Sequence, residues 1–90
     1  MTFFPKAVDV AAYDAEPAAL KLLSRRDCER LRAVPLCSLG ETVLIAMADP
    51  FDGAILMELE ALTKRGVEPL RASDTEIATA IARGYPELAG

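Results

Sequence analysis

The chain has 90 residues, of which 52% are hydrophobic and 6% aromatic, with fourteen Asp and Glu against ten Lys and Arg. This length predicts one small domain, and the hydrophobic fraction excludes global disorder. The net charge of −4 disfavours a general nucleic-acid binder, because neutralising phosphates needs a cationic surplus. No apolar run approaches about eighteen residues and the start lacks a signal-peptide pattern, so we expect a cytoplasmic protein without direct membrane insertion.

The sequence begins with an irregular segment, which is followed by a segment of helical character. Residues 1–15 carry no sustained hydrophobic period and are predicted to form an irregular N-terminal arm, followed by a single domain over residues 16–90. Residues 16–33 show helical periodicity, with apolar side chains near one face and basic ones on the others. Ser24 and Asp27 match a capping box, so a short helix over Pro17–Leu23 is expected to break at Ser24 and restart there.

Two strands are predicted next. Val34–Ser38 reads as an edge strand, because Pro35 has no backbone N–H to donate to a neighbour. After a turn at residues 39–41, Thr42–Ala48 is an almost continuous apolar run, which suits a central strand covered on both faces. The two strands should form an antiparallel hairpin. In the central strand we expect buried side chains at Val43, Ile45 and Met47, with Leu44 on the opposite face.

The second half of the chain predicts a helix, a strand and a helix. Asp49-Pro50 is typical of a helix start, and Gly66 is the expected stop. The apolar stripe of this helix consists of Ile55, Leu56, Leu59 and Leu62. Val67–Ala72 is predicted as a third short strand. Residues 73–76 form an S-x-x-E capping box before a last helix, which carries Ile77, Ala80 and Ile81 and closes near Gly84.

These elements predict the fold class. Their order is helix, strand, strand, helix, strand, helix (α-β-β-α-β-α), and the class is α/β (α+β): a small three-stranded mixed sheet with helices packed on it. The unit over residues 42–72 is a strand–helix–strand crossover, which predicts a right-handed connection and parallel outer strands.

The sequence offers no catalytic equipment. It contains no His and neither a phosphate loop nor a dinucleotide fingerprint, so we expect no enzyme, no metal and no cofactor. Cys28 and Cys37 match no CxxC pattern and are interpreted as reduced, partly buried thiols, although their spacing also allows a disulfide. Asp49 and Asp52 are interpreted as helix caps, because a cation site would need more oxygen ligands. Met47 and Met57 are interpreted as core residues.

A basic stretch stands out in this acidic chain. It holds five of the ten basic residues, and one reading is a solvated surface, partly neutralised by an Arg25–Glu29 helical pair. The functional reading is a surface for an acidic partner, or for the phosphates of a small ligand. The candidate partner-binding residues are Lys21, Arg25, Arg26, Arg30 and Arg32. The apolar residues Phe3 and Phe4 are the second choice for a docking site.

Several motifs in their order resemble a known bacterial family. They are Ser24–Leu36, the strand motif Thr42–Pro50, Gly66–Leu70, Ser73–Ile77 and Tyr85. Over about residues 17–86 they are similar to the N-terminal domain of type II secretion and type IV pilus assembly ATPases. The resemblance implies a non-catalytic cytoplasmic module that docks the ATPase motor on the cytoplasmic part of an inner-membrane platform protein.

One branch of that family implies an alternative function. Its members bind cyclic di-GMP through an R-L-G-x-x-L motif followed by L-x-x-A-L-x-x-Q. Residues 1–23 contain no R-L-G and no Gln, and the chain has few aromatic side chains on which a guanine could stack. The docking domain is therefore the leading hypothesis, a small-molecule ligand is not expected, and a cyclic di-GMP sensor is the alternative.

Overall fold

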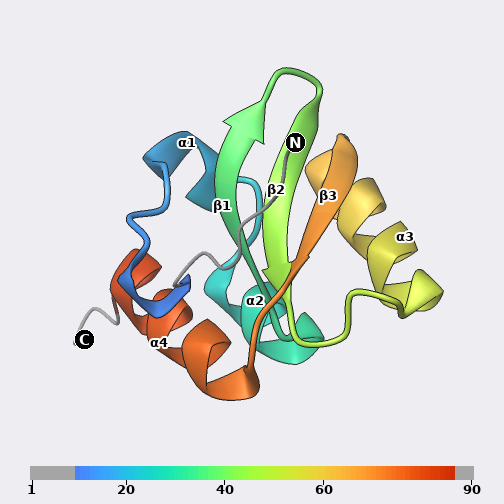
Figure 1. Ribbon diagram of the computed structural model, residues 1–90. Helices are drawn as coiled ribbons and strands as arrows, with labels where there is room; N and C mark the ends of the chain where they lie inside the picture. The colour runs from blue at the N-terminus through green and yellow to red at the C-terminus, as the bar shows by residue number, and fades with distance from the viewer. Residues whose placement is uncertain (1–9, 87–90) are drawn as a thin grey trace, which may run out of the picture.

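The computed structural model describes residues 10–86. The elements in chain order are the 3-10 helix η1 (Val10–Ala12), α1 (Pro17–Leu20), α2 (Arg25–Leu31), β1 (Ala33–Leu39), β2 (Thr42–Met47), α3 (Gly53–Thr63), β3 (Gly66–Arg71) and α4 (Asp74–Gly84). The strands form one sheet in the order β1-β2-β3, in which β2 pairs antiparallel with β1 and parallel with β3. Helix α3 lies beside β3, and α1 and α4 lie on the β1 side (Figure 1). The predicted mixed sheet and element order are confirmed, and the hand of the crossover stays a prediction.

Strand β2 is the buried centre of the sheet. Val43, Ile45 and Met47 have no exposed surface, as predicted from the apolar run. Leu44 is half-buried and packs against the same core. A strand flanked by partners on both sides and covered on both faces has no solvent-facing row, which explains its continuous apolar sequence.

The two edge strands each contain a proline. Pro35 lies in β1, where the register with β2 shifts between Pro35 and Cys37, so the predicted edge position is confirmed. The N–H groups of Gly66, the first residue of β3, and of Ala72, which follows the strand, donate to the carbonyls of Glu41 and Met47 at 3.0 Å. Because inward and outward N–H groups alternate along a strand, Pro69 lies at an outward position. Its ring removes one donor from the open edge of the sheet.

Helix starts at serine follow the sequence signals. The Ser24 Oγ accepts from the Asp27 N–H at 3.1 Å, so the predicted break between two helices is confirmed. Helix α1 ends at Leu20, three residues earlier than predicted. At α4 the capping box is complete: the Ser73 Oγ accepts from the Glu76 N–H at 3.0 Å, and the Glu76 carboxylate accepts from the Ser73 N–H at 2.9 Å.

Helix α3 differs from the prediction at both ends. Its N-cap is Asp52, whose Oδ1 accepts from the N–H groups of Ala54 and Ile55 at 3.0 and 3.2 Å. The Asp49 carbonyl instead accepts from the Asp52 N–H in the preceding turn, so the start predicted at Asp49-Pro50 is wrong. The helix ends at Lys64, which adopts a left-handed conformation with φ 59°. Gly66 is the first residue of β3 and not the helix stop.

The side chains of α3 also correct two predictions, because Leu62 of the predicted apolar stripe is 39% exposed and Met57 is exposed as well. Leu59 is fully buried, whereas Met57 is 71% exposed, so the interpretation of Met57 as a core residue is wrong. At 3.6 residues per turn, a residue two positions from Leu59 lies about 160° away around the helix. Met57 therefore points away from the sheet.

The described end of the N-terminal arm packs on the domain. Val10 is 1% exposed, and Arg83 of α4 donates to the Ala11 carbonyl at 2.8 Å and to the Asp14 carboxylate at 2.6 Å. Residues 10–14 are thus fastened to α4. The boundary between arm and domain at residue 16 stays a prediction, and Phe3 and Phe4 lie outside the described residues.

Candidate functional site

Helix α2 carries most of the basic residues that were singled out in the sequence. It starts at the Ser24 cap and ends at Arg32, whose φ of 54° is left-handed. Cys28 and Leu31 are its buried residues. The remaining positions of this short helix, arginines included, therefore face neighbouring elements or solvent.

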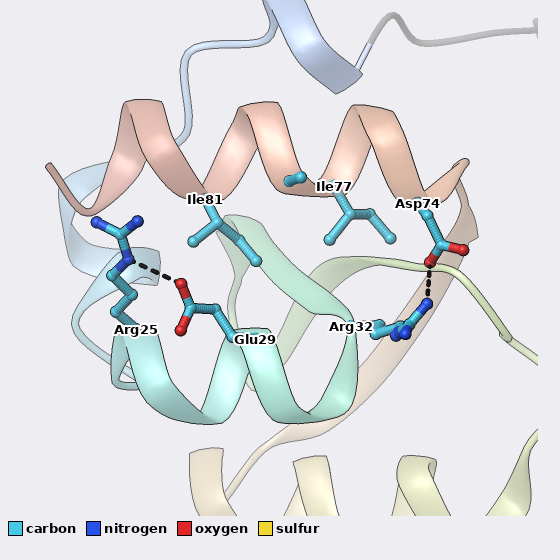
Figure 2. A pocket seen from close by; sticks show the side chains of 7 residues that line it. Arg25, Glu29, Arg32, Asp74, Ile77 and Ile81 are labelled. Atoms are coloured by element: carbon cyan, nitrogen blue, oxygen red, sulfur yellow. Dashed lines mark hydrogen bonds and ion pairs between the residues drawn. The ribbon is translucent and has the colours of Figure 1, made fainter. Parts of the chain in front are cut away.

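Two of these arginines hold α2 against α4. Arg25 donates from Nε to the Glu29 carboxylate at 3.0 Å and from Nη1 to the Tyr85 carbonyl at 2.6 Å. Arg32 donates to the Asp74 carboxylate at 2.9 Å. Figure 2 shows the two ion pairs at opposite ends of the space between the helices. Both guanidinium groups are thus engaged within the domain.

A third arginine joins α2 to α3. Arg30 donates to Asp27 at 3.0 Å and to Glu58 at 2.6 Å. The hydrogen bond from Arg30 holds the pKa of the Asp27 carboxyl below its usual range. Lys21 and Arg26 are both exposed, and within residues 10–86 they form no ion pair. Three residues of the predicted cluster, Arg25, Arg30 and Arg32, therefore form ion pairs within the domain. The other two, Lys21 and Arg26, form no ion pair within the part of the chain that the structure describes.

A groove of about 370 Å³ separates α2 from α4. Its apolar floor comes from α4, where Ile77 and Ile81 point toward α2 (Figure 2). The two arginines at its ends are each matched by a carboxylate, so the charges of the lining cancel. This groove favours neither anions nor cations strongly.

The thiol of Cys28 is not suited to nucleophilic chemistry. It has no exposed surface, and burial raises the pKa of Cys28 to about 11. The neighbouring Tyr85 hydroxyl donates to the Leu20 carbonyl at 2.7 Å, and burial also raises the pKa of Tyr85. Cys37 is half-buried, and both thiols are free. Cys37 thus matches the partly buried thiol expected from the sequence, whereas Cys28 is fully buried, and the two do not form the disulfide that their spacing allows.

Three further observations concern residues 10–86 as a whole. No three Cys, Asp or Glu side chains in this part lie close enough together to hold a metal ion. None of its helices has the length and apolar character that crossing a bilayer requires. Each of its buried side-chain nitrogen and oxygen atoms has a hydrogen-bond partner.

Comparison with known protein families assigns the chain to one of them. Residues 3–90 match the profile of the MshEN domain. The chain belongs to the MshEN domain family. Two relatives of this MshEN domain are type IV pilus assembly ATPases named PilB. The resemblance to the N-terminal domain of secretion and pilus ATPases is therefore confirmed, and this domain corresponds to their regulatory part and not to their catalytic part.

The relatives are much longer than this MshEN domain. PilB of Myxococcus xanthus is 32% identical over 81 residues, and PilB of Thermus thermophilus is 31% identical over 83. Each alignment covers 90% of this chain, but only 14% and 9% of the respective relatives. The chain thus spans a small fraction of the proteins that it matches.

A solved structure of MshE with cdg (cyclic di-GMP) has a similar fold. Its TM-score with this MshEN domain is 0.78 at 28% identity, over 87% of this chain and 57% of that chain. The likeness agrees with the family assignment.

Sequence reasoning missed one feature of this MshEN domain. Large apolar side chains are exposed next to and on α3, where Phe51 is 81% and Met57 71% exposed. The signal lies in Gly53–Thr63, whose apolar residues are spread around the helix and not gathered on one side. Such a helix is normally covered on both faces, but periodicity alone cannot show which of its faces the rest of the chain covers.

Proposed function

We propose that this MshEN domain is a non-catalytic docking and regulatory module. It attaches an ATPase of type II secretion or type IV pilus assembly to the cytoplasmic domain of an inner-membrane platform protein. Family membership and the two pilus ATPase relatives support this proposal. The module acts in the cytoplasm and reaches the inner membrane through its partner.

Exposed apolar side chains carry the proposal. Phe51 and Met57 are largely solvent-exposed in a domain of only 90 residues, and the Arg71 guanidinium lies 5.6 Å from the centre of the Phe51 ring. Aromatic residues, Met and Arg are enriched in protein interfaces. A binding partner that covers these side chains would remove them from water.

The basic residues of the sequence hypothesis have a secondary role in this proposal. Lys21 and Arg26 offer positive charge without an internal ion pair among the described residues, which increases the rate of encounter with an acidic surface. Arg25, Arg30 and Arg32 would have to exchange internal carboxylates for external ones. The net gain from such an exchange is small at an exposed site.

Direct binding tests the proposal. The chain and the cytoplasmic domain of the platform protein from the same genome are purified and mixed in a calorimeter. We expect a one-to-one complex, and the full ATPase without this domain should bind more weakly than the intact ATPase. Failure of both the isolated chain and the intact ATPase to bind would contradict the docking function.

A cyclic di-GMP sensor is the second candidate, favoured by the similarity to MshE with cdg. In this chain two guanidinium groups flank the apolar floor between α2 and α4. Phosphates at that site would have to displace Glu29 and Asp74 from Arg25 and Arg32, which places this candidate second. Calorimetric titration with cyclic di-GMP, with GTP as the control nucleotide, tests it. Saturable heat with cyclic di-GMP alone would support the sensor.

A further inference from the structure

Helix α3 lies at one side of the sheet, beside β3 (Figure 1). Leu59 and Thr63 are its buried residues, and Ile55 and Leu56 are half-buried against the core. The Thr63 hydroxyl donates to the Leu59 carbonyl at 2.8 Å, so this buried hydroxyl has a partner. The inner face of α3 thus packs on the core of the domain.

The opposite face of α3 is also apolar, and it is exposed. We call it the α3 outer face; it consists of Gly53, Ala54, Met57 and Ala61, all of which are exposed. These residues share one side of the helix because they recur at intervals of three and four residues. Three of the four are small, so a second backbone can approach closely around Met57, whose flexible side chain adapts to varied partners.

The surroundings of this face are acidic. Residues 49–63 contain no Lys or Arg but four carboxylates, which are those of Asp49, Asp52, Glu58 and Glu60. Asp52 caps the helix and Glu58 accepts from Arg30, whereas Asp49 and Glu60 make no ion pair within residues 10–86. The neighbouring cations are Lys64 and Arg65 at the helix end, Arg71 beside Phe51, and Arg30, which is engaged by Glu58.

We propose that the α3 outer face is the docking surface of this domain and that it binds a basic, amphipathic segment of a partner protein. The apolar side chains of that segment would cover Met57, while its Lys and Arg side chains would face Asp49 and Glu60. Complementary charge selects such a partner and disfavours anionic lipid or nucleic acid. The inference rests on the proposed docking function and specifies its surface.

Substitution of Met57 tests the surface. The probe is the cytoplasmic domain of the platform protein, and binding is measured with the wild-type chain and with Met57→Glu, Met57→Leu and Ala82→Glu. We expect Met57→Glu to weaken binding about thirtyfold or more, as for a central interface residue, whereas Met57→Leu keeps most of it. Ala82→Glu, which places the same charge at an exposed position of α4, should bind as the wild type does.

Charge reversal tests the chemistry of the partner. Glu60→Lys should weaken binding and reduce its dependence on salt, because one attractive charge becomes repulsive. Equal thermal unfolding of all variants shows that the fold is intact, as expected at exposed positions. If the wild type binds and neither Met57→Glu nor Glu60→Lys weakens that binding, the α3 outer face is not the docking surface, although the docking function stands. If the wild type does not bind at all, the docking function itself is overturned.

Photo-crosslinking identifies the molecule that contacts the α3 outer face without requiring a purified partner. Benzoylphenylalanine at position 57, with position 82 as the control site, is irradiated in the intact ATPase in membranes. A crosslinked peptide rich in Lys, Arg and apolar residues is expected. A crosslink to a second copy of this chain, to lipid, or to an acidic segment overturns the proposal.

Discussion

The carboxylate of Glu16 accepts a hydrogen bond from the backbone N–H of Ser38 at 3.0 Å. The backbone N–H of Glu16 in turn donates to the Leu36 carbonyl at 2.8 Å. A single residue thus pairs with both a donor and an acceptor of β1, which is an edge strand of the sheet. Exposed edges of this kind invite pairing with other chains, and Glu16 covers this one.

Glu16→Ala should destabilise the domain modestly. The substitution removes the Ser38 hydrogen bond but no helix cap, because the Glu16 side chain does not cap α1. We expect a loss of about 1 kcal/mol in the free energy of unfolding, measured with urea. Glu16→Gln keeps an acceptor oxygen and should stay near the wild-type value. Equal losses in the two variants would mean that the bond to Ser38 contributes nothing.

Ser73→Ala should weaken the start of α4. The serine hydroxyl and the Glu76 carboxylate satisfy two backbone N–H groups reciprocally, and loss of such a cap costs about 0.5–2 kcal/mol. Urea unfolding measures the change, with the exposed neighbour Thr75→Ala as the control. Hydrogen exchange in the first turn of α4 should accelerate in Ser73→Ala alone. Unchanged exchange there contradicts the capping role.

The local signals explain how much of the fold could be predicted. The caps at Ser24 and Ser73 are contacts within three residues, and the apolar run of β2 reflects its burial on both faces, so all three could be read from the sequence. The start of α3 could not be, because Asp49 and Asp52 are equally good caps three residues apart. The end of α3 was missed because Lys64, and no glycine, takes the left-handed position.

The candidate site depends on long-range contacts, which the sequence does not reveal. Arg30 meets a carboxylate 28 residues away and Arg32 one 42 residues away. A cluster of like charges on one helix therefore predicts exposed positive surface until tertiary structure brings Glu58 and Asp74 to it. The exposed apolar face of α3 was missed for a related reason. Apolar residues are spread around this helix, and only the packing decides which of its sides is covered.

Arg30→Gln should change the response of the domain to acid. The hydrogen bond from Arg30 lowers the pKa of Asp27 in the folded state. A lowered pKa contributes stability that is present above the unfolded pKa and is lost as the pH falls through the folded pKa. In Arg30→Gln the pKa of Asp27, followed by carboxyl NMR, should rise toward its ordinary value. An unchanged titration would show that Arg30 does not stabilise the Asp27 carboxylate.

The two cysteines should differ in reactivity. Burial raises the pKa of Cys28 to about 11, so few thiolates exist at mildly alkaline pH, and the side chain has no exposed surface. Cys37 is half-buried and more accessible. We expect iodoacetamide in mildly alkaline buffer to label Cys37 first in the native protein, and both residues at similar rates in urea, as measured by peptide mass spectrometry. Faster native labelling of Cys28 would contradict the packing of α2.

Charge reversal at Arg30 and Arg32 would change the stability of the domain as well as its charge toward a partner. Glu at positions 30 and 32 would face Glu58, Asp27 and Asp74, so these reversals replace attraction by repulsion within the domain. Each exposed pair contributes only about 0.2–1 kcal/mol, but their loss loosens α2 from both neighbouring helices. A triple reversal of Arg26, Arg30 and Arg32 therefore lowers stability as well as any partner binding, and cannot separate the two effects.

The double variant Lys21→Glu, Arg26→Glu avoids this problem, because neither residue forms an ion pair within residues 10–86. If these cations steer an acidic part of the partner, association at low salt should slow several-fold, while dissociation and the unfolding temperature stay unchanged. The difference should disappear at high salt, where exposed charges are screened. Stopped-flow association kinetics at two salt concentrations measure this. An unchanged association rate at low salt would leave Lys21 and Arg26 as solvated surface, and the α3 outer face as the docking surface.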